Sequence, residues 1–289
     1  MASRRRAFAG NAPGTFFVDD TCIDCDTCRQ LAPLTFHAVE GHSEVHAQPL
    51  DAGIMRLAAQ ALLSCPTSSI GADRSLELAP VIRDFPLSIT PEVSYCGFNA
   101  ESSYGAHSYL LRRPDGNWLI DSPRWVPQLA QAFERLGGIT GIFLTHRDDV
   151  ADADAYARHF SARQVIHAAD ADAAPLAQPI VGHEAVALAP GLTAFPVPGH
   201  TAGSMVLLAD DQYCFSGDHL WFSRPLGRLN ASRGVCWHSW PEQTRSMQRL
   251  ATQCFRWVLP GHGQRYQQES VQRMQEDVAS LSKVMLLAA

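Results

Sequence analysis

Four cysteines in the first quarter of the chain have a spacing that suits a metal cluster. Cys22, Cys25 and Cys28 form a C-x2-C-x2-C run, and Cys65, directly followed by Pro66, comes after a long gap. Three thiolates so close in sequence must surround one point, and a fourth followed by proline completes a tetrahedral set suited to a cubane iron–sulfur cluster. A structural zinc ion held by four cysteines is the alternative, but zinc sites more often show two paired C-x2-C units.

This cysteine segment resembles a bacterial ferredoxin with a single cluster, over residues 15–70. The ferredoxin run continues as C-x3-C-P, and the corresponding positions here are Ala32 and Pro33. The cysteine that would serve a second cluster is therefore alanine. The resemblance implies one cluster with four ligands: Cys22, Cys25, Cys28 and Cys65. Four ligands favour [4Fe–4S], and a three-iron form could result from oxidative damage.

Five short islands of acidic and imidazole side chains follow in the rest of the chain. Each comes after an apolar stretch, and small residues flank most of them, which lets backbones approach closely. The islands lie at 120–122, 145–149, 198–204, 216–218 and 260–263. A lone histidine of this kind is most often structural, but α/β folds place their sites just past the strand ends.

In this order and spacing, the islands resemble the motifs of the metallo-β-lactamase superfamily over residues 76–289. The strongest pieces are PGHTAGS at 198–204 and PGHG at 260–263. The second motif of that family usually reads His-x-His-x-Asp-His after Thr. Here Asp148 replaces the second histidine, and Val150 and Ala151, which cannot bind a metal, stand where Asp and His are expected.

The resemblance implies a metal centre built from the retained motif residues. One ion would be held by His146, Asp148 and His200, with Asp218 at the position that usually bridges two ions. Asp148 and Asp218 are the expected catalytic residues. Asp121 matches the first motif of the family and is expected to orient the metal-binding loop through hydrogen bonds.

The altered motif leaves the second ion and the metal identity open. A second ion would keep His262 and Asp218 but lose two ligands, and Asp149 or Asp152 could replace them only if the loop is rearranged. An aspartate in place of a histidine shifts the preference from zinc toward iron or manganese, without excluding zinc. Flavodiiron members of the superfamily also have a carboxylate here, so we expect one further ion, iron or zinc. A degenerate site without metal is the alternative.

The pattern of apolar residues predicts the elements that must position these groups. Strands alternate with helices, which indicates an α/β architecture. Helices are predicted at 52–63, 125–136, 152–160, 242–250 and 267–287, and strands at 110–111, 118–120, 142–144, 165–166, 193–195, 205–208, 213–215 and 257–259. We expect a disordered tail (1–14), a ferredoxin-like α+β domain (15–75) and an αββα sandwich of the metallo-β-lactamase type (76–289).

Composition narrows the classes of protein. The 289 residues are 46% hydrophobic and 18% charged, which excludes disorder and coiled coil. No apolar run approaches the roughly 18 residues of a membrane span, and no secretory signal follows the arginines at 4–6, so we expect a cytoplasmic protein. Eight cysteines fit a reducing compartment, and a net charge of −6 without a basic stripe argues against nucleic acid.

Three functions are compatible with this reading. The first is a metal-dependent hydrolase of an ester, thioester, lactone or phosphoester, with an appended cluster domain. The second is a redox enzyme in which the cluster feeds electrons to a non-haem iron site. The third is a non-catalytic electron carrier or redox sensor. Expected partners are a small-molecule substrate and a soluble electron-transfer protein, because the sequence has no flavin or dinucleotide fingerprint.

Three tryptophans follow Asp218, at positions 221, 237 and 240. An aromatic loop at this place would suit the rim of a substrate site for a flat or apolar molecule. Packing in the core is the alternative for the same residues.

Overall fold

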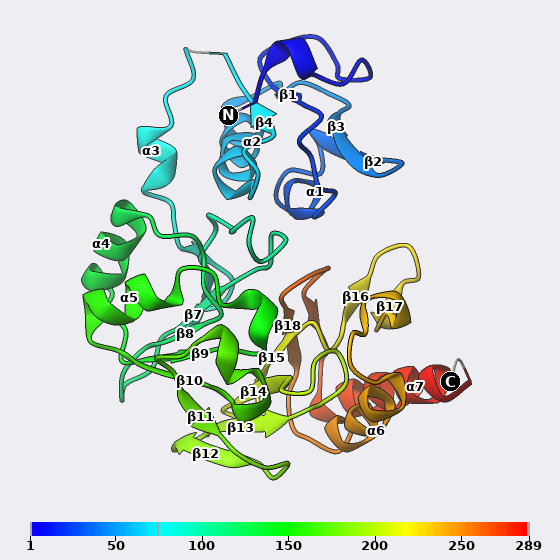
Figure 1. Cartoon of the computed structure of the whole chain (residues 1–289). Coiled ribbons are helices and arrows are strands. Elements are labelled where there is room, and N and C mark those ends of the chain that lie inside the picture. Colours follow the sequence, from blue (N-terminus) through cyan, green and yellow to red (C-terminus); the bar gives the residue numbers. More distant parts are fainter. Residues whose placement is uncertain (1, 74, 288–289) are drawn as a thin grey trace. The chain divides into compact units, whose positions relative to one another are not determined.

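The computed structural model describes residues 2–73 and 75–287 (Figure 1). The chain divides into two compact units. Unit 1 comprises the chain up to Asn117 together with Ser122–Ile139. Unit 2 comprises Trp118–Asp121 and the chain from Thr140 onward. The domain boundary expected after residue 75 lies within unit 1.

The cysteine region of unit 1 consists of short elements around one long helix. These are η1 (Arg4–Arg6), β1 (Phe17–Val18), α1 (Thr27–Leu31), β2 (Phe36–Val39), β3 (His42–Val45), α2 (Ala52–Ser64) and β4 (Ile70–Gly71). Strand β1 pairs with β4 and strand β2 with β3, both antiparallel. The side chain of Asp51 caps α2, and the helix ends where Cys65 precedes Pro66, because a residue before proline disfavours the helical region. The predicted helix at 52–63 is confirmed.

The first residues of the chain, expected as a disordered tail, instead make defined contacts. The backbone N–H of Ser3 donates to Asp19 Oδ2 at 2.8 Å. The side chain of Asn11 donates to Val18 O at 2.8 Å and accepts from the N–H of Val45 at 3.1 Å. One asparagine thus supplies hydrogen bonds that hold the segment against two strands, and composition alone does not reveal this.

The rest of unit 1 is a small antiparallel sheet with flanking helices. Its elements are α3 (Ala79–Ile82), β5 (Leu87–Ser88), β6 (Val93–Tyr95), β7 (Tyr109–Leu111) and α4 (Pro127–Arg135). Strand β6 pairs with β5 on one side and with β7 on the other. The segment between β6 and β7 contains four left-handed residues, Gly97, Phe98, Tyr104 and Gly105, so the chain turns sharply there.

Unit 2 begins with parallel strands. Its first elements are β8 (Trp118–Ile120), β9 (Gly141–Phe143), η2 (Arg147–Asp149), α5 (Ala153–Phe160), β10 (Arg163–His167), η3 (Ala168–Ala173) and β11 (Gln178–Ile180). Strands β8, β9, β10 and β11 pair in this order, all parallel. The carboxyl ends of parallel strands meet at one edge, so the residues after β8 and β9 are brought together.

The second sheet of unit 2 carries the other motifs. It contains β12 (Val186–Ala189), β13 (Leu192–Pro196), β14 (Met205–Ala209), β15 (Tyr213–Gly217), β18 (Trp257–Pro260) and β19 (Tyr266–Gln267), in this order. Strands β13 to β15 are antiparallel neighbours, and β18 runs parallel to β15. Strands β13, β15 and β18 therefore end at the same edge, where the islands at 198–204, 216–218 and 260–263 lie.

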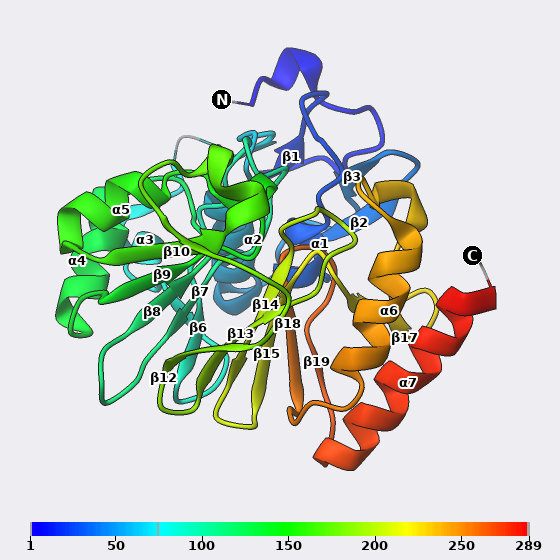
Figure 2. The same ribbon diagram turned by 60° about the horizontal axis from the view of Figure 1, so that its bottom comes forward.

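Two helices cover one face of this sheet. The remaining elements are the ribbon β16 (Trp221–Ser223) and β17 (Arg228–Asn230), η4 (Arg233–Val235), α6 (Trp240–Leu250) and α7 (Val271–Leu287). Helices α6 and α7 lie side by side in Figure 2 and share a buried core with the sheet, formed in part by Val206, Met247, Val258, Met274 and Val278. The predicted mixed α/β architecture is confirmed, with element boundaries shifted by up to four residues.

None of the helices within residues 2–73 and 75–287 combines the length and the hydropathy needed to cross a lipid bilayer.

Candidate metal centre

Four loops at the carboxyl ends of strands build the candidate centre. His146 and Asp148 follow β9, His200 follows β13, Asp218 follows β15 and His262 follows β18. These five residues are the metal ligands that the motifs predicted.

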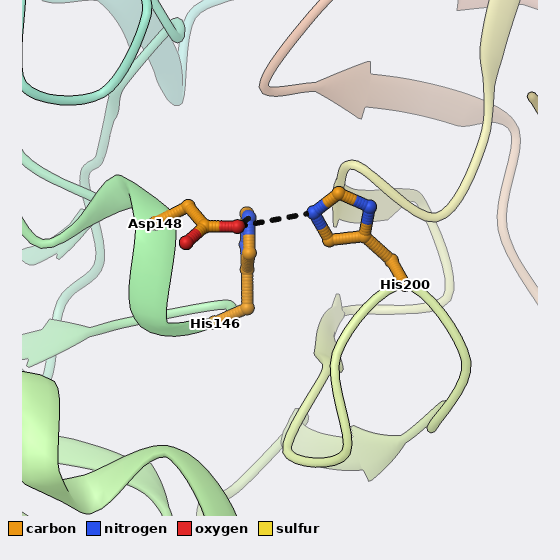
Figure 3. A group of neighbouring side chains, drawn as sticks. All are labelled: His146, Asp148 and His200. Carbon is orange, nitrogen blue, oxygen red and sulfur yellow. Dashed lines mark ion pairs between the residues drawn. The ribbon is translucent and has the colours of Figure 1, made fainter. Parts of the chain in front are cut away.

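Three of the five predicted ligands form a tight group. His200 Nε2 lies 3.4 Å and His146 Nε2 3.7 Å from the same oxygen, Asp148 Oδ2. The two imidazole rings are nearly perpendicular, with centroids 4.8 Å apart. Figure 3 shows the side chains converging from two separate loops, with the carboxylate of Asp148 directed at the ring of His200. Their donor atoms all lie within 4.8 Å of one another.

Asp218 joins this group and connects it to His262. Asp218 Oδ2 lies 3.8 Å from His146 Nε2, 3.7 Å from His200 Nε2 and 3.8 Å from His262 Nε2. One carboxylate oxygen therefore faces all three predicted histidines. The structure brings the five predicted ligands into one cluster.

Asp149, which the motif left out of register, also enters the cluster. The turn of η2 brings Asp149 back toward His146, three residues earlier, with Oδ2 3.9 Å from His146 Nδ1. His146, Asp149 and Asp218 form a second group that could hold a cation. Asp152 instead occupies the residue before α5. Of the two aspartates considered as replacements, only Asp149 is found in these groups.

Burial governs the charges in the centre. Desolvation lowers the pKa of His146 to about 4, although Asp218 opposes this effect. Burial acts in the same direction on His200, but Asp148 and Asp218 outweigh it and raise the pKa. The contact with His200 lowers the pKa of Asp148. Burial raises the pKa of Asp149 well above its usual range, and the neighbouring carboxylates add to this effect.

The donor set fits a metal ion. His146 Nε2, His200 Nε2, Asp149 Oδ2 and Asp218 Oδ1 are buried without a hydrogen-bond partner, and leaving such atoms unpaired is costly. Two ligands held about 2.1 Å from one ion lie about 3.0–3.4 Å apart, and the distances between histidine nitrogens and Asp148 or Asp218 are 3.4–3.8 Å. A cation would satisfy these atoms with small adjustments. Two imidazoles and several carboxylates suit iron, manganese or zinc.

Two further buried aspartates support the ligand loops. Asp121 accepts the backbone N–H of Thr145 at 2.8 Å and its hydroxyl at 3.0 Å, and that hydroxyl lies 3.0 Å from His146 Nδ1. This agrees with the orienting role expected for Asp121. Asp170, which the motifs did not indicate, accepts the hydroxyl of Thr201 at 2.5 Å beside His200. Asp170 follows shortly after β10, and this position behind a strand end could have marked it in the sequence as a residue of the site.

The three tryptophans after Asp218 have different environments. Trp240, the first residue of α6, is buried in the core, so core packing is the correct interpretation for this residue. Trp237 is 67% exposed, its ring centroid is 6.3 Å from that of His200, and its backbone N–H donates to His200 O. Trp221 is partly buried. An exposed indole therefore lies beside a predicted ligand.

In unit 1, all four predicted cluster ligands line one cavity, whose lining residues include Cys22, Cys25, Cys28, Cys65 and Ser43. The backbone N–H of Ser43 donates to Cys22 Sγ at 3.5 Å. The N–H of Ser69 donates to Cys65 Sγ at 3.3 Å.

Such N–H···S bonds stabilise thiolates that bind a cluster. Burial raises the pKa of Cys25 to about 11 and also raises that of Cys28, so these sulfurs need a cationic partner to ionise. The residues fit an iron–sulfur cluster.

Comparison with family models agrees with both sites. The model described as the 4Fe-4S single cluster domain of Ferredoxin I matches residues 18–72. The model of the metallo-beta-lactamase superfamily matches residues 89–281. The first match suggests a [4Fe–4S] cluster and the second suggests a metal ion. The two resemblances inferred from the motifs are confirmed. No curated protein matches the chain.

Solved structures show the same fold at low sequence identity. The DIM-1 metallo-beta-lactamase is 15% identical and has a TM-score of 0.51, with 68% of this chain and 95% of that chain covered. A metallo-beta-lactamase from Hirschia baltica is 16% identical and has a TM-score of 0.50, with 68% and 96% covered. At this identity the likeness shows the fold alone.

Proposed function

Because the chain belongs to the metallo-β-lactamase superfamily, we propose that it is a metal-dependent hydrolase with an appended [4Fe–4S] domain. The substrate class is an ester, thioester, lactone or phosphoester. We further propose a cytoplasmic protein that acts on a small molecule.

The observation that carries this proposal is the convergence of unpartnered donor atoms. His146 and His200 direct Nε2 toward Asp148 Oδ2 and Asp218 Oδ2, over distances of 3.4–3.8 Å. Both nitrogens are buried without a hydrogen-bond partner. A merely structural cluster of buried histidines would pair these atoms with protein groups.

Each residue has a role that follows from its contacts. His146, Asp148 and His200 would hold the ion, which when bound acts as a Lewis acid and lowers the pKa of a water molecule toward neutrality. Asp218 faces the histidines with Oδ2 and keeps Oδ1 as a buried acceptor without a partner, so it can take a hydrogen bond from the attacking water. Trp237 offers an apolar surface for part of the substrate.

A second candidate function is a redox reaction at a non-haem iron site. The carboxylate-rich donor set favours it, since two imidazoles with carboxylates and open positions are typical of non-haem iron enzymes. In that case a soluble electron-transfer protein would reduce the cluster, and the cluster would supply electrons to the iron.

A double variant tests the proposed function. The protein is purified without oxygen, loaded separately with zinc and with iron, and assayed on esters, thioesters, lactones and phosphoesters. His200→Ala with Asp218→Ala should abolish hydrolysis and leave the visible spectrum of the cluster unchanged. Hydrolysis that persists in the double variant would refute the site. Turnover that requires a reductant would favour the redox alternative.

A further inference from the structure

The iron–sulfur site is in contact with a segment that the ferredoxin-like match does not include. That match ends at residue 72, whereas Arg124, Asn99 and Gly105 contact cluster ligands or their neighbours within unit 1. We propose that residues 95–107 together with Arg124, all within unit 1, complete the iron–sulfur site, and that Arg124, Asn99 and Gly105 are positioning residues for Cys65 and Cys25.

Arg124 fixes the backbone at the last ligand. Its Nη1 donates to Cys65 O at 3.1 Å and to Asn99 O at 3.0 Å, and its Nη2 donates to Leu63 O at 2.9 Å. The rigid fork of a guanidinium can bind three carbonyls at once. Arg124 therefore connects the end of α2 and the Cys65 backbone to the segment after β6 through hydrogen bonds.

Asn99 connects the same segment to the other side of the cavity. It is fully buried, and its Nδ2 donates to Gly105 O at 2.7 Å and to Thr27 Oγ1 at 3.0 Å. Its Oδ1 accepts the hydroxyl of Tyr95 at 2.7 Å. Thr27 Oγ1 in turn lies 3.6 Å from Cys25 Sγ.

The hydroxyl of Thr27 can act on the cluster sulfur. Because Asn99 donates to Thr27 Oγ1, the hydroxyl hydrogen is left for another acceptor. Two acceptors are in range, Cys25 Sγ at 3.6 Å and His107 Nε2 at 3.5 Å. Of these two acceptors, the Cys25 thiolate is charged when it binds the cluster, so it is the stronger acceptor for the Thr27 hydroxyl. Hydrogen bonds to cluster sulfurs raise the reduction potential of the cluster.

Gly105 packs directly against Cys25 and Pro66. A Cβ atom at this position would lie 2.9 Å from Cys25 Cβ, 3.0 Å from Pro66 Cγ and 3.2 Å from Cys25 Sγ. The residue also has a φ of +86°. Glycine is therefore required here by close approach to a ligand as well as by backbone conformation.

Charge gives Arg124 a second effect. One-electron reduction makes the cluster more negative, and a cation beside the Cys65 backbone stabilises the reduced form. Removal of the charge should therefore lower the reduction potential. A Lys variant keeps the charge but loses the fork, which separates the two effects.

The test uses full-length protein, reconstituted with iron and sulfide and studied without oxygen. Arg124→Gln should lose iron to a chelator at least tenfold faster than the wild type, and reduction should become at least tenfold less favourable, about 59 mV lower for one electron. Compared with Arg124→Gln, Arg124→Lys should recover most of the wild-type reduction potential but should still lose iron to the chelator nearly as fast. Arg56→Gln removes an arginine of unit 1 that pairs with Asp84, and should change neither.

A glycine pair keeps the inference falsifiable if Arg124→Gln does not fold. Gly105→Ala should accelerate cluster loss and alter the electron paramagnetic resonance spectrum of the reduced cluster. Gly41→Ala imposes a similar backbone cost, with a φ of +78°, but nothing lies within 4 Å of its added Cβ. Equal cluster retention and spectra in the two glycine variants, or wild-type retention and potential in folded Arg124→Gln, would overturn the proposal.

Discussion

Gly261 separates two carboxylates of the metal centre, and its replacement gives a sharp test of that centre. In Gly261→Ala the added Cβ would lie 2.7 Å from Asp149 Oδ2 and 2.8 Å from Asp218 Oδ1. Ordinary C···O contacts are about 3.3–3.6 Å, so each carboxylate must move by roughly 0.6 Å. Both oxygens are buried and belong to short side chains, so little room is left for them to move.

The displaced carboxylates should weaken metal binding without unfolding the protein. Overpacking of this size costs about 1–3 kcal/mol in stability, whereas displaced carboxylates of a metal site weaken affinity by about 10–100-fold. We therefore expect Gly261→Ala to fold and to keep its iron–sulfur cluster. Its metal centre in unit 2 should bind zinc or iron about 10–100-fold more weakly than that of the wild type.

The assay starts from protein whose metal centre in unit 2 has been emptied and whose cluster is intact. Zinc or iron is then added in competition with a chromophoric chelator, and the Kd is obtained at equilibrium. Gly234→Ala is the matched control, because the nearest heavy atom to its added Cβ is 3.6 Å away and its φ is not positive. A Kd of Gly261→Ala within twofold of that of Gly234→Ala would refute the placement of the ligands.

Three further outcomes are expected. Cys65→Ser should bleach the broad visible absorption of the cluster and leave the metal content of the second site unchanged, as elemental analysis would show. Asp170→Asn weakens the bond to Thr201 beside a ligand loop and should lower metal affinity by about 10–100-fold, whereas Asp172→Asn, at a carboxylate 66% exposed, should not. Burial raises the pKa of Tyr266 from 10.0 to about 12. The free energy that this shift adds to the folded state is therefore fully present below pH 10 and is lost as the pH rises toward 12. Urea unfolding should show a smaller drop in the free energy of unfolding over this range for Tyr266→Phe than for the wild type.

The sequence predicted the site residues best where each follows a buried strand. His200, Asp218 and His262 come directly after strands that share one edge, so a motif read along the chain translates into neighbours in space. The helix at 52–63 was equally visible, because the spacing of its apolar residues is a local signal.

Asp149 shows why the sequence left the choice between Asp149 and Asp152 open. The motif placed it out of register, yet a 3-10 turn over Arg147–Asp149 brings it against His146. The shape of that turn depends on tertiary contacts, which no periodicity records. Arg124 and Asn99 were missed for a related reason, since their contacts with the cysteine region join residues that are 59 to 72 positions apart in the chain.

Metal content per chain tests the central claim most directly. Protein purified without oxygen should contain about four irons from the cluster and about one additional ion of iron, zinc or manganese. The additional ion should be absent from His200→Ala with Asp218→Ala and present in Cys65→Ser. About four irons and no other metal in the wild type, or an additional ion that persists in the double variant, would contradict the account.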